Sequence, residues 1–372
     1  MTVRRLTNPA DLAALPPGPT PPLGAGAWAV TRPDAHLAAT DARGLVARAS
    51  VWWRPRPTDP EHPGAAVGMI GHLDASGDGE AAAVLDAALD ALREHGCTRA
   101  VGPMDGSPWH AYRVVLGYGV PGAGYAAGGS RQDAAEAGGD RHGAPGAGPG
   151  GTPYPVPGTP SHPPFALEPS PPAGTERWLR AAGFETVETY HSALVDGLPD
   201  RAAALRQGLR AAQASDVTLR PFDPARAEAE LDALYRISLD VFARNPFYVP
   251  IPPEAFLATY RPLVSRVDPR LVVVAERGGE TVGICFGLPD AAQAARGAAV
   301  DTVIVKTVAV AREASGAGLG GLLVLAVEEA ARRAGLSRSI HALMHDGNLS
   351  VRISAHRPRR VIRRYALLGR AL

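Results

Sequence analysis

The chain has little lysine, little cysteine and no long hydrophobic run, and each shortage excludes a class of protein. Its two cysteines, Cys97 and Cys285, cannot form a disulfide framework or a metal site by themselves, so we expect no metal. No apolar run reaches the roughly 20 residues that cross a bilayer, so we expect no membrane segment. The 38 basic and 37 acidic residues leave a net charge of +1, which gives no electrostatic case for a nucleic-acid or membrane partner.

The composition is otherwise that of a globular protein. Hydrophobic residues make up 45% and charged residues 20% of the 372 positions, and this length is sufficient for two domains. Arg4 and Arg5 are not followed by the apolar segment of a signal peptide, so we expect a cytoplasmic protein. A monomer and a homodimer are both open.

The most informative stretch is 303–334, where a strand, a turn and a helix follow one another. β-branched residues predict the strand, Gly316, Gly318 and Gly320 predict the turn, and an Ala/Leu/Glu-rich run predicts the helix. This order points free backbone N–H groups off a helix N-terminus, an arrangement that binds phosphate or pyrophosphate. Gly-rich turns between a strand and a helix also occur as plain connections, which is the alternative.

The segment Ser315-Gly316-Ala317-Gly318-Leu319-Gly320 resembles the acetyl-CoA pyrophosphate loop of GNAT-type N-acetyltransferases. The family pattern is Arg or Gln, two residues, Gly, any residue, and Gly or Ala. Gly318 and Gly320 match it, whereas Ser315 stands where the family usually has Arg or Gln, so one side-chain contact is lost and the backbone contacts remain. A dinucleotide-binding loop fits less well, because the glycines are spaced GxGxGG and no acidic residue ends a second strand nearby.

The rest of the second half follows the layout that this resemblance implies. Its pattern predicts strands at 217–221, 271–275, 281–288, 301–310, 339–344 and 361–368, and helices at 224–240, 254–264, 318–333 and from 346. This order matches the GNAT layout except for one late strand. We therefore expect a GNAT acetyltransferase domain at 217–372, after a linker at 201–216.

The first half, 1–200, is a shorter version of the same plan. Strands are predicted at 43–53, 65–72, 98–101 and 187–194, an amphipathic helix at 80–95, and further helices from 109 and at 177–182. The segment 74–80 contains three acidic residues, which repel a pyrophosphate. We expect an α/β protein of two GNAT-like domains, each a twisted, mixed, largely antiparallel sheet flanked by helices, with the first copy degenerate.

Within the first half, 117–164 consists largely of Gly, Pro and Ala and predicts a disordered, low-complexity insertion. The segments GPMDGSPWHAYR and PFALEP on either side of it, with NPFYVPIP and VIVKTVAV, resemble bacterial tandem GNAT-like proteins. That resemblance implies an architecture and no particular substrate.

The resemblance also implies where acetyl-CoA, or another acyl-CoA, is bound. The strand before the loop, from Thr307 to Val310, provides the oxyanion donor and pairs with the pantetheine amides. Asn348 matches the family's Asn at the start of the next helix, although Asn is also a common N-cap residue. The implied cofactor contacts are Val308, Ala309, Val310, Ser315, Gly316, Ala317, Gly318, Leu319, Gly320, Asn348 and Ser350.

Acetyl transfer to an amine needs a base and an acid, and several residues are candidates. The family usually has Tyr about seven residues after the Asn, where this chain has Ala355, so Tyr365 is the candidate acid, with a half-buried strand residue as the alternative. Asp301 is the first choice of base. His345 and His341 follow, because histidine titrates near neutral pH.

Lys306 is the single lysine of an arginine-rich chain, and it stands in the predicted strand beside the loop. An ammonium with a shiftable pKa does chemistry that a guanidinium does not, so we include Lys306 among the catalytic candidates. The alternative is a strand residue whose head group reaches solvent.

Five residues next to turns are candidates for the acceptor pocket. They are Trp109, Tyr112, Arg113, Glu168 and Tyr248. The alternative, favoured for Trp109, is an aromatic core between the domains. If Glu168 faces the cleft, it favours a cationic amine.

The function expected is an acetyl-CoA-dependent N-acetyltransferase that acts on a small-molecule or peptide amine. A tandem GNAT that binds CoA or another ligand as a sensor or scaffold is the alternative. A third possibility, transfer from a charged tRNA, is disfavoured by the neutral net charge.

Overall fold

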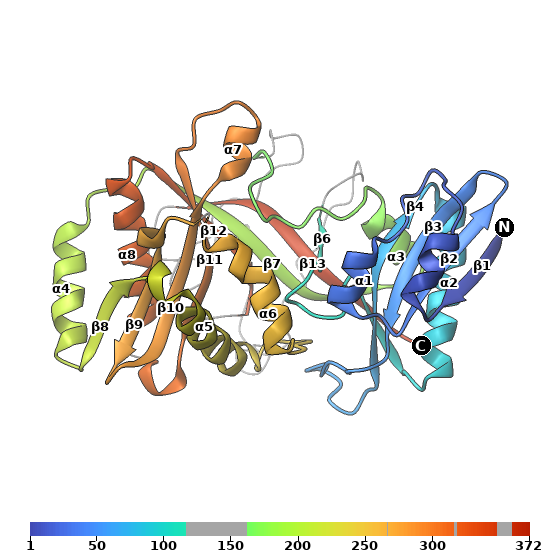
Figure 1. Ribbon diagram of the computed structural model, residues 1–372, viewed down its shortest axis with the longest axis horizontal. Helices are drawn as coiled ribbons and strands as arrows, with labels where there is room; N and C mark the ends of the chain where they lie inside the picture. Colours follow the sequence, from blue (N-terminus) through green and yellow to red (C-terminus); the bar gives the residue numbers. More distant parts are fainter. Residues whose placement is uncertain (117–161, 266, 316–317, 348–358) are drawn as a thin grey trace, which may run out of the picture.

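The computed structural model describes residues 1–116, 162–265, 267–315, 318–347 and 359–372. In these residues, 13 strands form one continuous sheet that runs through both halves of the molecule (Figure 1). The sheet is mixed and largely antiparallel, as expected from the sequence. The two expected sheets are joined edge to edge rather than separate.

The first half contributes five successive strands and the helix that covers them. These are β1 (Thr2–Leu6), β2 (Ala35–Asp41), β3 (Gly44–Trp52), β4 (Val67–Ala75), α2 (Asp78–Glu94) and β5 (Arg99–Gly102). Leucine, valine and alanine side chains at helical spacing put one face of α2 against β2, β3 and β4. The short helix α1 (Ala25–Thr31) covers the other face through Trp28.

The second half repeats this order. Its elements are β8 (Val217–Pro221), α5 (Ala227–Phe242), α6 (Pro253–Tyr260), β9 (Val272–Arg277), β10 (Glu280–Pro289), α7 (Ala291–Ala295), β11 (Thr302–Val310), α8 (Leu319–Arg333) and β12 (Arg338–His345). Glycines allow α8 to pack closely on the sheet, because a Cβ at Gly283 or Gly287 would meet Leu323 or Val327. Helices α5 and α6 lie on the opposite face, in front of the sheet in Figure 1.

The last strand of each half lies beside the other half. Strand β7 (Glu185–Asp196), which ends the first half after α3 (Thr175–Ala181), pairs with β12 of the second. Strand β13 (Arg360–Ala371) pairs with β5 of the first half and, near its middle, with β6 (Val114–Val115). The sheet order is therefore β1-β2-β3-β4-β5-β13-β7-β12-β11-β10-β9-β8. Tyr190 pairs with Tyr365 near the middle of the β7–β13 ladder, which makes the two halves approximately symmetric about this point.

Two expectations for local structure differ from the structure. The helix predicted from residue 109 is wrong: Met104 bridges to Tyr112, and Ser107 Oγ donates to the Val249 carbonyl at 2.6 Å, so 104–112 forms turns. The segment 201–216 contains a helix, α4 (Ala202–Gln213), where a linker was expected. It lies on α8, and Gly208 allows the close approach of Leu322. The low-complexity segment lies mostly outside the described residues.

Candidate functional site

Strands β11 and β12 part in the middle of the sheet. They are paired in parallel from Thr302 and Arg338 as far as Val305 and His341. Beyond this point β11 continues along β10 to Val310, while β12 continues along β7 to His345. In the described part of the chain, no strand pairs with the edge of β11 that faces β12 after Val305. The parting therefore leaves room for an extended ligand that bonds to the backbone.

Lys306 lies where the parting begins. Phe286 of β10 pairs with Thr307 while the next residue, Gly287, pairs with Val305, so Lys306 is the extra residue of a β-bulge. Bulges redirect a side chain and are common beside active sites.

The turn after β11 leads into α8 as the sequence predicts. Gly318 is the N-cap at φ 77°, a left-handed conformation that favours glycine, and the helix begins at Leu319. No acidic residue occurs in its first turn. The side chain of Ser315 is engaged locally, because its Oγ donates to the Arg312 carbonyl at 2.8 Å. Gly316, Ala317, Asn348 and Ser350 lie outside the described residues.

Of the three candidate bases other than Lys306, Asp301, the first-choice base, lies at the end of the paired β11–β12 segment that is farther from the parting. It precedes the strand and bonds to Arg338 at 2.6 Å, to Gln293 and to Thr302. Burial acts to raise its pKa, but these hydrogen bonds outweigh burial and hold the pKa at about 2. Such a carboxylate accepts a proton poorly, and its contacts favour a structural role.

The two histidines of β12 differ in position. His341 is buried against α8, with Nε2 at 3.0 Å from Glu328 Oε1. His345 lies at the end of the strand beside the parting, with Nε2 at 2.5 Å from Glu188 Oε2 of β7. Its ring meets that of Tyr190 edge-on, at 5.1 Å between centroids.

Arg113 of the first half lies near Lys306, and both are cations. The Arg113 guanidinium is held between the rings of Tyr112 and Tyr190, at 3.8 Å from each centroid. Burial, followed by the charge of Arg113, lowers the pKa of Lys306 to about 8. Burial likewise lowers the pKa of Arg113 to about 10, and its Nε and Nη1 atoms have no hydrogen-bond partner among the described residues.

Tyr365 is fully buried, and its hydroxyl donates to Glu168 Oε1 at 2.6 Å. Glu168 also accepts from Arg363 Nε at 2.9 Å, and the Glu168 side chain is only 6% exposed. Burial, together with the charge of Glu168, raises the pKa of Tyr365. The structure thus brings Tyr365 and Glu168 together, but in a closed network with Arg363 and Ser192.

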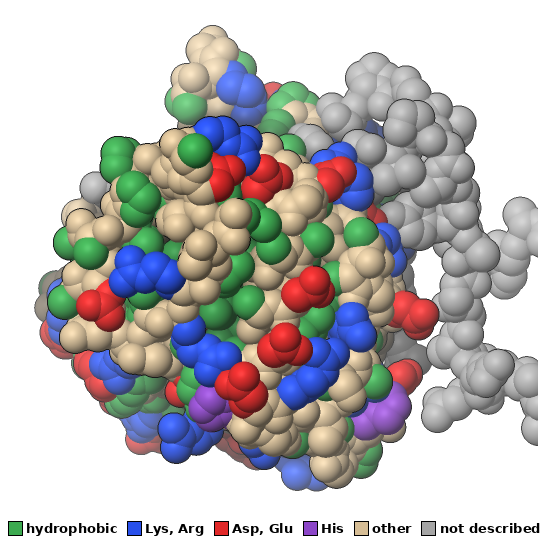
Figure 2. Space-filling view, turned by 90° about the vertical axis from the view of Figure 1, so that its right-hand side faces the viewer, with side chains coloured by type: hydrophobic (Ala, Val, Ile, Leu, Met, Phe, Trp, Pro, Cys, Tyr) green, Lys and Arg blue, Asp and Glu red, His purple; other side chains and the backbone are tan. Residues whose placement is uncertain are grey.

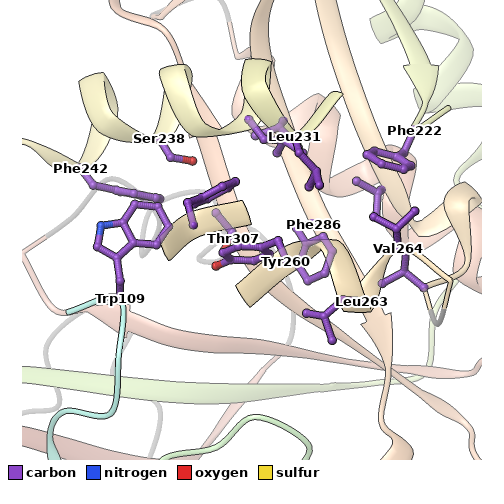
Figure 3. Close-up of a pocket in the computed structure, with 15 residues that line it drawn as sticks. Trp109, Phe222, Leu231, Ser238, Phe242, Tyr260, Leu263, Val264, Phe286 and Thr307 are labelled. Carbon is purple, nitrogen blue, oxygen red and sulfur yellow. The ribbon is translucent and has the colours of Figure 1, made fainter. Parts of the chain in front are cut away.

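Trp109 and Tyr248 meet at the junction of the halves, where Trp109 Nε1 donates to the Tyr248 hydroxyl at 3.2 Å. Trp109 also lines an apolar cavity, partly open to solvent, between helices α5 and α6 and the sheet (Figure 3). This cavity was not predicted from the sequence. The signal available was the aromatic set Phe242, Phe256 and Tyr260 on consecutive helices, which alone does not distinguish a core from a cavity.

On the face of the first half shown in Figure 2, basic and acidic side chains are interspersed. None of the described helices combines the length and the apolar character needed to cross a membrane.

Residues 231–352 match the model of the acetyltransferase (GNAT) family. This range includes most of α5, the parting of β11 and β12, and α8, so the second half of the chain carries the pattern of this family. No curated protein sequence matches the chain.

Several solved structures are similar to the chain. A GCN5-related N-acetyltransferase from Sphaerobacter thermophilus is 14% identical, with 91% of this chain and 80% of that one covered and a TM-score of 0.44. A tandem GNAT protein from the clavulanic acid biosynthesis pathway is 12% identical, with coverage of 100% and 98% and a TM-score of 0.46. Eis1 from Mycobacterium abscessus is 13% identical, with coverage of 99% and 73% and a TM-score of 0.45. Since all three TM-scores lie below 0.5, the assignment rests on the family match.

Proposed function

We propose that the protein is an acetyl-CoA-dependent N-acetyltransferase, with the cofactor bound in the second half and an amine as acceptor. The observation that carries the proposal is the unpaired edge of β11 after Val305, followed by the glycine turn into α8. An open edge and a helix N-terminus suit the two parts of this cofactor, an amide-bearing arm and a pyrophosphate.

The backbone supplies the contacts to the cofactor. The N–H and C=O groups of Val308, Ala309 and Val310 hold the pantetheine arm, and the first N–H groups of α8, from Leu319 and Gly320, hold the pyrophosphate. Because Ser315 bonds to its own turn, the backbone carries most of the affinity at this end. Bound acetyl-CoA supplies an activated acyl carbon, which bonds to the amine nitrogen as the C–S bond breaks and the thiolate leaves.

Lys306 is the base in this proposal. Its pKa of about 8 leaves part of the population neutral near physiological pH, and the neutral Nζ accepts the proton of the acceptor ammonium. The bulge places it where β11 leaves β12, beside the strand segment that holds the thioester. Asp301 is less suitable, because it precedes β11 at the far end of the paired segment.

The acceptor amine enters on the β12 side of the parting. Glu188 and His345 form a polar pair there, next to Tyr190. A carboxylate near the entrance attracts an ammonium ion. Glu168 serves the structure instead, since Arg363 and Tyr365 already occupy its oxygen Oε1.

A binding protein without catalysis is the second candidate. It is favoured by Tyr365, the candidate acid, whose hydroxyl is bonded to Glu168 inside the core. A sensor needs the cofactor site but neither the base nor the acid.

Calorimetric titration of acetyl-CoA tests the cofactor site. Gly318→Glu puts a strained residue and a negative charge at the N-cap of α8, and we expect it to abolish binding. Gly297→Glu is the matched control, since Gly297 also has a positive φ, 75°, and open space around it. Equal loss in both variants, or no binding by folded wild type, contradicts the proposal. Turnover with an amine panel then separates the enzyme from the sensor.

A further inference from the structure

We infer that the apolar cavity between α5, α6 and the sheet holds the hydrocarbon chain of an acyl thioester longer than acetyl. This inference rests on the proposed function and specifies its acyl donor. The cavity is lined by residues from both halves of the molecule (Figure 3). No charged side chain is among the lining residues.

The cavity adjoins the edge of β11 that the proposal gives to the thioester. Thr307 lines it, and Thr307 directly follows Lys306 at the bulge. An acyl group whose carbonyl lies against this edge therefore has its chain beside the cavity. The hydrocarbon chain extends from the carbonyl carbon of the thioester, so no other part of the acyl donor needs to enter the cavity.

The floor of the cavity crosses the sheet at right angles to the strands. Thr307 pairs with Phe286, Phe286 pairs with Val272, and the Val272 carbonyl accepts from the Phe222 N–H. All four residues line the cavity. Three steps between strands span roughly 14 Å, which suits an acyl chain of medium length rather than a two-carbon group.

Helices α5 and α6 form the roof, and the first half closes the end nearest the parting. Ser238 and Phe242 of α5 and Tyr260 of α6 face the floor, and Trp109 stands beside Phe242 at 5.8 Å between ring centroids (Figure 3). Trp109 is fixed by its hydrogen bond to Tyr248. The first half thus supplies a wall of the cavity in the second.

The two sides of the parting differ in polarity, and this difference decides the occupant. The β12 side presents His345 and Glu188, which suit an ammonium ion. The β11 side presents Thr307 and Phe286, and burial of a charged amine there costs far more than burial of a hydrocarbon. The acyl chain therefore belongs in the cavity and the amine opposite it.

Binding of a chain-length series tests the inference without requiring turnover. The probes are CoA, acetyl-CoA and a non-hydrolysable thioether analogue of octanoyl-CoA, titrated into the full chain. Since each buried methylene strengthens binding by about threefold to fourfold, we expect the octanoyl analogue to bind at least about a hundredfold more tightly than acetyl-CoA. Octylamine, the alternative occupant, should not compete with it.

A filled cavity should remove the preference for the long chain. Ser238→Phe places a ring in the cavity from the middle of α5, and we expect the octanoyl and acetyl ligands then to bind within about threefold of each other. Asp240→Phe, at an exposed position of the same helix, is the control and should keep the preference. Should Ser238→Phe fail to fold, Leu234→Ala, which enlarges the cavity, should shift the preference to a longer chain.

The outcomes separate this inference from the proposed function. If acetyl-CoA binds and the octanoyl analogue binds no more tightly, the cavity does not hold the chain, while the cofactor site stands. A long-chain preference that survives Ser238→Phe, or competition by octylamine that this variant removes, also overturns the inference. If no CoA derivative binds to folded protein, the proposed function itself fails.

Discussion

The two halves of the molecule have the same strand order, yet their central partings are used differently. In the first half, β4 and β5 are parallel only from Val67 to Met69 and from Arg99 to Val101. The chain then turns into the space between them: the Met104 N–H donates to the Ile70 carbonyl, and Asp105 Oδ1 accepts from the His72 N–H at 2.7 Å. In the second half, none of the described strands pairs with the edge of β11 that faces β12 at the corresponding place, after Val305.

This difference shows how one half of a duplicated plan can fill the space that we propose as a ligand site in the other. In the first half the backbone groups available to a ligand are bonded to residues 104 and 105 of the same chain. Gly71 permits the close approach, because a Cβ there would lie 2.4 Å from the Met104 carbonyl oxygen. The N-cap of α2, Gly77, has an extended conformation and is followed by Asp78 and Glu80. One cofactor site per chain is therefore expected.

The largest effect is expected at the open site. Lys306→Met removes the proposed base, and we expect kcat to fall by about a hundredfold or more. In the wild type, activity should rise with pH with a midpoint at about 8, since Lys306 must be neutral. His72→Gln, near the corresponding bulge of the first half, is the control and should leave kcat within about twofold of wild type.

The Lys306 variant should be more stable than wild type at pH 7. The pKa of Lys306 is lower in the folded chain than its usual 10.5, so at pH 7 the folded state carries the cost of a buried ammonium, which is relieved only as pH rises from about 8 to 10.5. A thermal melt checks this. Loss of activity together with a lower melting temperature would point to misfolding rather than to loss of a base.

The next largest effect is expected on stability, at the buried network of Glu168, Arg363 and Tyr365 that joins the two halves. Glu168→Gln removes one partner of the buried Arg363 pair, which should lower the free energy of unfolding by about 3 kcal/mol. Denaturant unfolding measures it. If Glu168 instead bound the acceptor, its replacement would raise the acceptor KM, and we expect that KM to be unchanged.

A comparable effect on stability, in the opposite direction, is expected at Asp105, which lies in the filled space between β4 and β5 of the first half. Burial raises the pKa of Asp105 to about 6, so the folded state binds more protons than the unfolded one between about pH 4 and 6. The wild type therefore loses stability as pH rises through this window. Asp105→Asn keeps an acceptor for the His72 N–H and should be more stable than wild type at pH 7 by about 3 kcal/mol. A pH series of melts decides this, and a variant with the wild-type pH profile would contradict it.

The smallest effect concerns the cation beside the base. Arg113→Met removes a charge that lowers the pKa of Lys306, so the midpoint of the pH–activity profile should move upward. At pH 7 we expect kcat to fall severalfold because less Lys306 is neutral. An unchanged midpoint would show that Arg113 does not act through Lys306.

The sequence predicted most strands and helices, because their apolar periods were regular and their turns rich in glycine. The strand and helix around the loop are confirmed within about a residue at Thr302–Val310 and Leu319–Arg333. Sequence periodicity carries no information on strand partners, so the pairing of β7 with β12 was not predicted. The helix expected from residue 109 failed because a tertiary hydrogen bond from Ser107 outweighed local preference.

The candidate site was only partly predictable for a related reason. The glycine turn is a local signal, and so is the isolation of Lys306 among arginines. By contrast, the proximity of Arg113 to Lys306 joins residues about two hundred positions apart, and the contact of Glu168 with Tyr365 does the same. The apolar cavity is lined by several helices and strands of the second half and by a tryptophan from the first, which no single stretch of sequence reveals.

The exchange of β7 and β13 makes the chain a covalently linked counterpart of a dimer. Each half pairs its last strand with the other half. Strand β7 of the first half pairs with β12 of the second, and β13 of the second half pairs with β5 of the first. A second half expressed alone would expose the edge of β12 and find its missing partner only in another polypeptide. Joining the halves in one chain makes the partner's effective concentration independent of expression level. It also lets the first half fill its own parting while its strand β7 still completes the sheet of the second.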